Sequence, residues 1–210
     1  MIKIIDYKAG NAPSVLHAVE RLGFKAEFAS TPEDLKNAAR IILPGVGSAG
    51  ATMDSLRESG VADALSECVV NKKTPFLGVC VGLQILFEHS QEDYALCFGW
   101  LKGRVRKFDS ASVRVLSKLR PTGSLRIPQM GWNQVRFINE TPLGATEGYF
   151  YFVNSYYAEP EDPGDIWGIA EYGESFTAAV RRDNIYGTQF HIEKSGETGL
   201  RVLKGFLEIC

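Results

Sequence analysis

The 210-residue sequence has few of the features that indicate a nucleic acid or a membrane as partner. Its net charge is only −2, and the charges are mixed, so it lacks the basic surface of a nucleic-acid-binding protein. The one basic cluster, over residues 104–120, has no repeated interleaving of aromatic residues and is expected to be a solvated hairpin or loop. Long hydrophobic runs are also missing. The apolar start at residues 2–5 contains Lys3 and ends at Asp6, too short for a signal peptide or a membrane span.

Cysteine is scarce, and its spacing excludes the usual cysteine-based structures. The four cysteines, at positions 68, 80, 97 and 210, form no Cys-x-x-Cys pair and no other metal-ligand or disulfide spacing. We therefore expect neither a metal nor another cofactor. Without disulfides the chain is expected in a reducing compartment, the cytoplasm.

One cysteine nevertheless lies in the most informative segment of the sequence. Gly78-Val79-Cys80-Val81-Gly82 joins an apolar strand pattern to a helical pattern. A Gly-x-Cys-x-Gly turn in this position is a nucleophile elbow with sulfur in place of the serine oxygen. The glycines keep side chains off the neighbouring backbone, and the start of the helix favours a thiolate. The alternative is a buried free cysteine at a strand end, but the two flanking glycines favour a nucleophile.

A cysteine nucleophile needs a histidine, and the sequence contains only three. His89 should lie nine residues along the helix that Cys80 begins, about 13 Å away. His17 falls in an amphipathic helical stretch, so neither is expected to reach the sulfur. His191 ends an expected strand, and Glu193 should project from the same face of it. Glu193 would orient the ring of His191 toward Cys80. A structural histidine with a solvated glutamate is the alternative, and the elbow favours the catalytic interpretation.

Residues 44–50, Pro-Gly-Val-Gly-Ser-Ala-Gly, follow an apolar strand and could complete an acyl-transfer site. Backbone N–H groups of Val46 and Gly47, with that of Val81 after the nucleophile, would form an oxyanion hole. The same loop matches the dinucleotide-binding pattern Gly-x-Gly-x-x-Gly. That fingerprint requires a helix directly after the glycines and an acidic residue at the end of the next strand. Neither pattern follows here, so the oxyanion hole is favoured.

Strand and helix patterns alternate over the first ninety residues, which predicts parallel strands with right-handed crossovers. From about residue 99 strands dominate, partly antiparallel, and a last helix is expected at about 197–207. No internal repeat or linker appears, so we expect one α/β domain over residues 1–210. The expected strands are 2–5, 25–29, 40–43, 76–79, 103–108, 149–157, 166–171, 177–181 and 185–190, and the other helices are 13–22, a short helix that opens at 31–34, 61–70 and the elbow helix.

Three motifs together resemble the class I, triad-type glutamine amidotransferases: Gly-Val-Cys-Val-Gly-Leu-Gln (78–84), Pro-Gly-Val-Gly (44–47) and Gln-Phe-His-x-Glu-Lys-Ser (189–195). Within this family, Asp6-Tyr7-x-x-Gly10-Asn11, Met130-Gly131-Trp132-Asn133 and residues 151–157 look like the glutaminase subunits of imidazole glycerol phosphate synthases. The matches run in order from residue 2 to the C-terminal helix. The resemblance implies the single-domain fold of this family, a mixed, largely parallel sheet flanked by helices.

The resemblance also implies an activity. Glutamine would be hydrolysed to glutamate and ammonia through a thioester at Cys80. The ammonia would pass through a tunnel to a separate (β/α)8-barrel cyclase, forming a heterodimer that makes imidazole glycerol phosphate and AICAR in histidine biosynthesis. The substrate contacts carried over are Gln84, Ser155 and Tyr156. The implied cyclase interface comprises Asn11, Met130, Trp132, Asn133 and Lys194.

Of these, Trp132 is expected in an exposed turn, where tryptophan often anchors an interface. Without the resemblance, a tryptophan filling the core beneath a loop would be favoured.

Five positions depart from the family pattern. Ile192 replaces a proline, Asn154 and Gln129 each replace a histidine, and Lys8 and Ala12 are unusual near the first turn. None belongs to the triad, so the acyl chemistry is expected to survive. The departures concern the choice of synthase partner. The alternatives are a paralogous glutaminase that feeds ammonia to another synthase, such as one that amidinates surface sugars, and a non-catalytic binding partner with the same fold.

Overall fold

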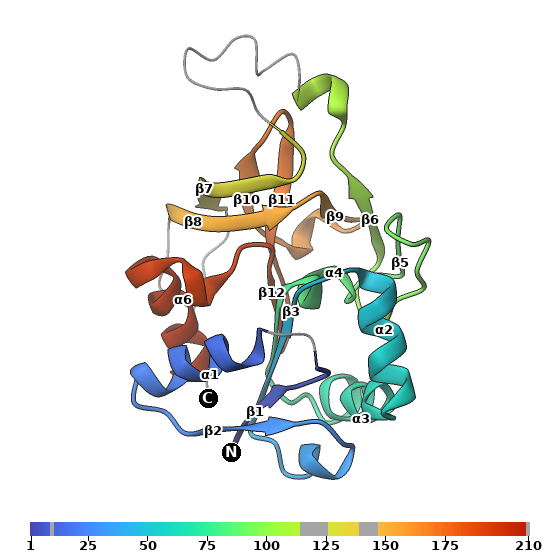
Figure 1. Cartoon of the computed structure of the whole chain (residues 1–210), viewed down its shortest axis with the longest axis vertical. Helices are drawn as coiled ribbons and strands as arrows, with labels where there is room; N and C mark the ends of the chain where they lie inside the picture. Colours follow the sequence, from blue (N-terminus) through green and yellow to red (C-terminus); the bar gives the residue numbers. More distant parts are fainter. Residues whose placement is uncertain (9–10, 114–125, 139–146, 209–210) are drawn as a thin grey trace.

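The computed structural model describes residues 1–8, 11–113, 126–138 and 147–208. Its strands form one twelve-stranded mixed sheet with the order β2-β1-β3-β4-β12-β11-β10-β7-β8 (Figure 1). β5, β6 and β9 lie off this path, with β9 joining β11 to β6. None of the described helices is both long and apolar enough to cross a membrane.

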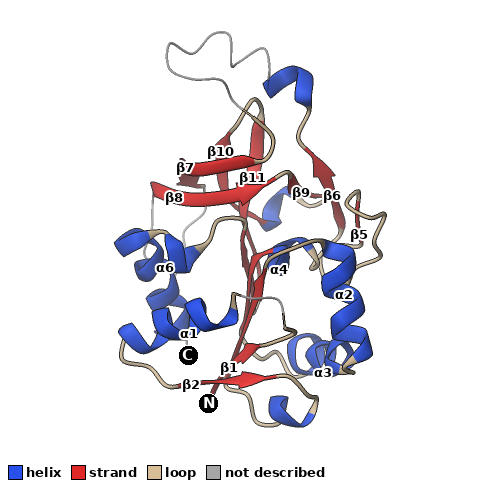
Figure 2. Ribbon diagram, in the orientation of Figure 1, coloured by secondary structure: helices blue, strands red, loops and turns tan. Residues whose placement is uncertain are grey.

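Half of the sheet is parallel. It consists of β2 (Ala26–Ala29), β1 (Ile2–Ile5), β3 (Arg40–Gly45), β4 (Phe76–Cys80) and β12 (Ile185–Thr188). The central strands β3 and β4 are short apolar runs that are buried almost throughout, as expected for strands covered on both faces. The covering helices are α1 (Ala12–Arg21) and α6 (Gly196–Glu208) on one side, and α2 (Ala49–Glu58) and α3 (Val61–Ser66) on the other (Figure 2).

The other half is antiparallel and is built around aromatic side chains. It continues from β12 through β11 (Ser175–Arg182), β10 (Ile166–Glu171), β7 (Gln129–Phe137) and β8 (Glu147–Asn154). β9 (Tyr156–Pro160) and β6 (Gly103–Lys107) complete it, and the short strand β5 (His89–Ser90) pairs parallel with β6. Inside, the rings of Phe150 and Phe190 lie 4.0 Å apart between centroids. Phe190 directly precedes His191, so this core supports the chain where the triad histidine begins.

The expected mixed α/β sheet is confirmed, and so is the change from alternating to strand-rich structure. Several elements differ in detail. The strand expected over 149–157 is two strands, β8 and β9, which separate at Ser155. Residues 129–137, expected to include a turn, form the long strand β7. The helix expected over 61–70 is α3 followed by a π-helical turn, η2 (Glu67–Asn71). Two 3-10 turns lie in connections between strands: η1 (Glu33–Leu35) between β2 and β3, and η3 (Pro163–Asp165) between β9 and β10.

The elbow helix is much shorter than the sequence pattern indicated. α4 spans only Val81–Gln84, a single turn. His89 therefore does not lie along that helix but on β5, where it is exposed. The apolar residues after α4, such as Leu86 and Phe87, are fully buried in irregular backbone, so their spacing reflects burial rather than helix. His89 still has no place in the site, though for a different reason from the one expected.

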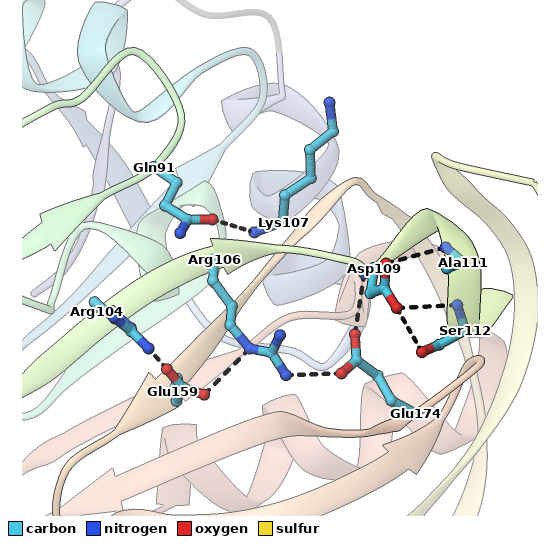
Figure 3. Close-up of polar contacts among 9 residues, drawn as sticks. All are labelled: Gln91, Arg104, Arg106, Lys107, Asp109, Ala111, Ser112, Glu159 and Glu174. Atoms are coloured by element: carbon cyan, nitrogen blue, oxygen red, sulfur yellow. Dashed lines mark hydrogen bonds and ion pairs between the residues drawn. The ribbon is translucent and has the colours of Figure 1, made fainter.

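The basic cluster is also different from the expected solvated loop. Arg104 and Arg106 lie on β6 and pair with acidic residues of neighbouring elements (Figure 3). Glu159 on β9 accepts from Arg104 Nε at 2.7 Å and lies 3.1 Å from Arg106 Nε. Glu174 accepts from Arg106 Nη2 at 2.7 Å. The two arginines of β6 therefore form ion pairs that join β6 to β9 through Glu159, and Arg106 also pairs with Glu174. Arg114, Lys118, Arg120 and Cys210 lie outside the described residues.

Candidate active site

The backbone at Cys80 has the strained geometry of a nucleophile elbow. Cys80 ends β4 and precedes α4 with φ 55° and ψ −107°, a conformation that non-glycine residues rarely adopt. The glycines on either side are required by packing. A Cβ at Gly78 would overlap the backbone of Gly82, and a Cβ at Gly82 would overlap the carbonyl oxygen of Leu43. The turn therefore exists only because both positions lack side chains.

The structure brings together the three residues expected to form a triad. His191 Nδ1 lies 2.9 Å from Oε1 of Glu193, and the side chain of Cys80 is near enough to the ring to raise its pKa. The side chains of His191 and Glu193 are almost completely buried, with 3% and 0% of their surface exposed. Cys80, His191 and Glu193 thus form one buried network at the carboxyl end of β4.

The route by which His191 meets Glu193 is not the one expected. β12 ends at Thr188, and His191 instead precedes a 3-10 turn, η4 (Ile192–Lys194). The two side chains therefore do not share the face of a strand. The turn brings them together, with the N–H of Lys194 donating to the carbonyl of His191 at 3.1 Å. Ile192, which stands in place of the family's proline, is fully buried within this turn.

The electrostatics of the pair favour a charged imidazole. Burial lowers the pKa of His191, but the hydrogen bonds and charges of Cys80 and Glu193 outweigh it and raise the pKa to about 10. Burial also raises the pKa of Glu193, and His191 and Asn11 outweigh this and lower it below its usual value. At neutral pH the site therefore holds an imidazolium oriented by a carboxylate, beside a sulfur nucleophile.

A cavity of about 230 Å³ opens onto Cys80. All the residues expected to form the oxyanion hole or contact the substrate line it: Val46, Gly47, Val81, Gln84, Ser155 and Tyr156. His191 reaches the same cavity. Four lining residues were not expected in the site, Pro128, Val153, Asn154 and Glu92, and the acidic one is Glu92. It lies in the loop after β5, its Oε2 accepts from the N–H of Ala49 at 3.0 Å, and burial raises its pKa. Nothing in the sequence near Glu92 indicated a site, because only the fold brings this loop to the elbow.

Gln84 and a second glutamine form a buried amide relay behind the nucleophile. Gln84 Nε2 donates to the carbonyl of Tyr156 and to Oε1 of Gln189, both at 3.1 Å. Gln189 Nε2 in turn donates to the sulfur of Cys80 at 3.6 Å. Sequence reasoning missed Gln189 as a site residue, although a polar residue at the end of an apolar strand was an available signal.

The residues of the expected oxyanion hole line the cavity, but one of their N–H groups already makes a hydrogen bond within the protein. The N–H of Val46 donates to the hydroxyl of Tyr7 at 3.3 Å. It would have to leave that bond before it could stabilise an oxyanion. The loop itself lies against the elbow, since a Cβ at Gly45 would meet Val81 at 2.7 Å. Gly10 of the motif that begins at Asp6 lies outside the described residues.

The two positions where amides replace the family's histidines are direct neighbours. Gln129 on β7 and Asn154 on β8 pair across the two strands, and both are buried. Asn154 lines the cavity, and its Nδ2 donates to the carbonyl of Tyr156 at 3.0 Å, the oxygen that also accepts from Gln84. The two other unusual residues lie before and at the start of α1, where Lys8 has a positive φ of 67° and Ala12 is buried.

The residues expected at a partner interface fall into two groups. Met130 and Trp132 are 66% and 57% exposed and project from the same face of β7, and Lys194 is exposed on η4. Trp132 therefore lies in a strand rather than a turn, and it does not fill the core. Asn133 is half-buried, and its Nδ2 donates to the carbonyl of Glu171 at 3.0 Å. Asn11 is buried, and its Nδ2 donates to Oε1 of Glu193 at 2.7 Å.

Comparisons with known proteins agree with this geometry. The sequence pattern of the family described as "Glutamine amidotransferase class-I" matches residues 3–210. The chain is 44% identical to "Imidazole glycerol phosphate synthase subunit HisH" of Leptospira borgpetersenii and 43% identical to "Imidazole glycerol phosphate synthase subunit HisH 2" of Pseudomonas aeruginosa. Both matches cover 100% of this chain and 100% of the relative.

Solved structures support the fold independently. A crystal structure of a glutamine amidotransferase superposes with a TM-score of 0.75 at 19% identity, covering 99% of this chain and 97% of the other. A strained cysteine at the end of a parallel strand, the fold around it and a sequence match over nearly the whole chain all lead to one assignment. The chain belongs to the class-I glutamine amidotransferases.

Proposed function

We propose that this protein is the glutaminase subunit of an imidazole glycerol phosphate synthase, hydrolysing glutamine and supplying ammonia to a cyclase. The observation that carries the proposal is the buried network of Cys80, His191 and Glu193 at the floor of a cavity. A nucleophile, a proton donor and an orienting carboxylate are what acyl transfer from an amide requires. The full-length similarity to subunits named for that synthase supports the pathway.

The reaction follows from the positions of these groups. The sulfur of Cys80 attacks the side-chain amide carbon of glutamine, and backbone N–H groups at Val81 and at residues 46–47 would hold the oxygen that becomes negative. His191, charged at neutral pH, gives its proton to the leaving nitrogen, so ammonia departs and a thioester remains. His191 then accepts a proton from water, and the hydroxide releases glutamate and restores the sulfur.

The cavity also supports glutamine as the substrate class. Glu92 is an acidic lining residue beyond the triad, and a half-buried carboxylate suits the α-ammonium group of an amino acid. Main-chain groups and the hydroxyl of Ser155, with Tyr156, would hold the rest of the backbone of the substrate. Gln84 would support the site indirectly, because its Nε2 donates both of its hydrogen bonds to protein groups, the carbonyl of Tyr156 and Oε1 of Gln189.

The partner would be a cyclase subunit, a (β/α)8 barrel that receives ammonia through a tunnel within a heterodimer. Support comes from the names of the relatives, which are subunits of a synthase. It also comes from the exposed apolar side chains of Met130 and Trp132, with Lys194 as a charged contact. We place the complex in the cytoplasm, because the described cysteines, Cys68, Cys80 and Cys97, are all free thiols.

The test is glutamate release from glutamine by the chain combined with its cyclase and the substrate of that cyclase. The wild type should release glutamate, and the variant Cys80→Ser should not. Formation of imidazole glycerol phosphate with glutamine as the nitrogen source supports the pathway. Glutamate release without that product, for any cyclase encoded beside this chain, would assign the ammonia to another synthase. No glutamate under any of these conditions would refute the enzyme.

A further inference from the structure

Asn11 occupies the N-cap position of α1, where an asparagine side chain ordinarily caps the helix. It is the residue that precedes α1, and asparagine at such a position usually accepts a hydrogen bond from the first turn of the helix. Here the side chain makes no such cap. The main chain of Asn11 does begin the helix, since its carbonyl accepts from the N–H groups of Ser14 at 3.1 Å and Val15 at 3.4 Å. The side-chain amide is left for another partner.

That partner is the carboxylate of the triad. Asn11 Nδ2 donates to Oε1 of Glu193 at 2.7 Å, and it lies 3.5 Å from Nδ1 of His191. Oε1 therefore carries two bonds, one from Asn11 and one from the imidazole at 2.9 Å. The side chain of Asn11 is buried, and α1 contacts η4, which carries Glu193. The bond is thus shielded from water and held by packed elements on both sides.

The hydrogen bond from Asn11 is important because, within the described part of the chain, the other carboxylate oxygen of Glu193 has no such partner. Oε2 of Glu193 is buried and has no hydrogen-bond partner among the described residues. Without Asn11, little would distinguish the two oxygens, and rotation of the carboxylate could present either of them to the ring. A hydrogen bond to a fixed amide on α1 selects Oε1 and keeps it at the imidazole. Its short length and charged acceptor make it a strong one.

We propose that Asn11 is a positioning residue of the triad, which holds the Glu193 carboxylate in the orientation that directs His191 toward Cys80. This inference rests on the proposed glutaminase reaction and extends it. Asn11 does not line the cavity, so it acts through Glu193 and not on glutamine. It also connects the start of α1 with the catalytic groups, and the family resemblance places Asn11 itself at the cyclase interface.

The test uses two variants that remove the donor in different ways. Asn11→Leu keeps a similar volume, and Asn11→Asp keeps the shape while replacing the N–H donor by an oxygen. The matched control is Ser14→Ala, because Ser14 is exposed on the first turn of the same helix. Glutamate release is measured for the complex with the cyclase, as a function of glutamine concentration and of pH, together with the unfolding midpoint of each variant.

We expect both variants to lower kcat about tenfold or more, from the loss of a hydrogen bond to a charged group, while KM for glutamine stays unchanged. The acidic limb of the pH profile should also move to higher pH. The reason is that the bond from Asn11 is one of the interactions that lower the pKa of Glu193. A residue that only stabilised the fold would shift the unfolding midpoint but would not move that limb. Ser14→Ala should match the wild type in kcat, KM, the position of the acidic limb and the unfolding midpoint.

A readout without activity separates this inference from the reaction itself. The chain has only three histidines, so the Nδ1–H signal of His191 can be assigned by nitrogen NMR with a His191→Gln variant. We expect a low-field signal from the bond to Glu193 in the wild type, shifted or lost in Asn11→Leu and in Asn11→Asp. An unmoved signal and an unmoved acidic limb in either folded variant would overturn the role of Asn11. Absence of glutamate release by the wild type would instead overturn the proposed function.

Discussion

Gln189, which is fully buried, donates from its side-chain amide to the sulfur of Cys80 across 3.6 Å. Gln84 holds the other end of this amide, because its Nε2 donates to Oε1 of Gln189. The sulfur also lies 3.8 Å from the carbonyl oxygen of Val153, so it is held between an amide donor and a backbone acceptor. This relationship is a structural finding, and its contribution to the reaction can be measured.

Replacing Gln189 with leucine should slow the reaction and destabilise the protein. The sulfur loses a donor worth about 1 kcal/mol, which corresponds to roughly a fivefold lower kcat. One amide proton of Gln84 would be left without its buried acceptor, at a cost of about 1–3 kcal/mol in unfolding free energy. Steady-state glutamate release and urea unfolding measure both. Gln134→Leu, at an exposed position of β7, is the control, and equal kcat for the two variants would contradict the role of Gln189.

Glu92→Gln should weaken binding of glutamine more than it slows the chemistry. The variant keeps the shape and removes the charge that would pair with the α-ammonium group, so KM should rise about tenfold with a smaller change in kcat. The neighbouring Asp93→Asn is the control, because Asp93 is exposed and does not line the cavity. A glutamine analogue without the α-ammonium group should be bound equally by wild type and Glu92→Gln. A large difference for that analogue would show that Glu92 acts in another way.

Trp132→Ala should weaken association with the cyclase and leave thioester formation at Cys80 intact. Trp132 is exposed on β7 beside Met130, and truncating such an aromatic anchor typically costs about 2 kcal/mol, roughly a thirtyfold higher Kd. Calorimetry with the cognate cyclase measures the change. Tyr94→Ala is the control, since Tyr94 is also highly exposed but lies in the loop after β5 and not on β7. Unchanged association of Trp132→Ala would remove this residue from the interface.

The His191–Glu193 pair should make the free energy of unfolding decrease both when the pH is raised and when it is lowered. The pKa of His191 is raised from 6.5 to about 10, so its contribution is complete below 6.5 and is lost as pH rises toward 10. The pKa of Glu193 is lowered from 4.5, so its contribution is present above 4.5 and is lost as pH falls. The difference in unfolding free energy between wild type and His191→Gln should therefore be largest between pH 4.5 and pH 6.5, where both contributions are present.

Urea unfolding over a series of pH values provides the measurement. His17→Gln is the control, because it removes an exposed imidazole on α1. Its difference from the wild type should remain small at every pH. A difference for His191→Gln that is constant through the alkaline range would mean that the imidazole does not gain stability from its two partners.

The sequence alone predicted the elbow at Cys80 and determined the type of fold. The closely spaced glycines at positions 78 and 82 indicate a tight turn, and the overlap between a Cβ at Gly78 and the backbone of Gly82 is a local one, so the elbow could be predicted without coordinates. The apolar runs of β3 and β4 predicted buried parallel strands for the same reason. With three histidines in the chain, elimination was enough to select His191.

Only the tertiary structure decided which distant residues support that chemistry. Glu92, Gln189 and Asn11 lie 12, 109 and 69 positions from Cys80, and their contacts depend on how loops and helices pack around the elbow. The length of α4 was decided in the same way, because burial of Leu86 and Phe87 imitates the spacing of a helix. Periodicity reports which side chains are buried, whereas packing between distant segments determines which backbone and which neighbours they receive.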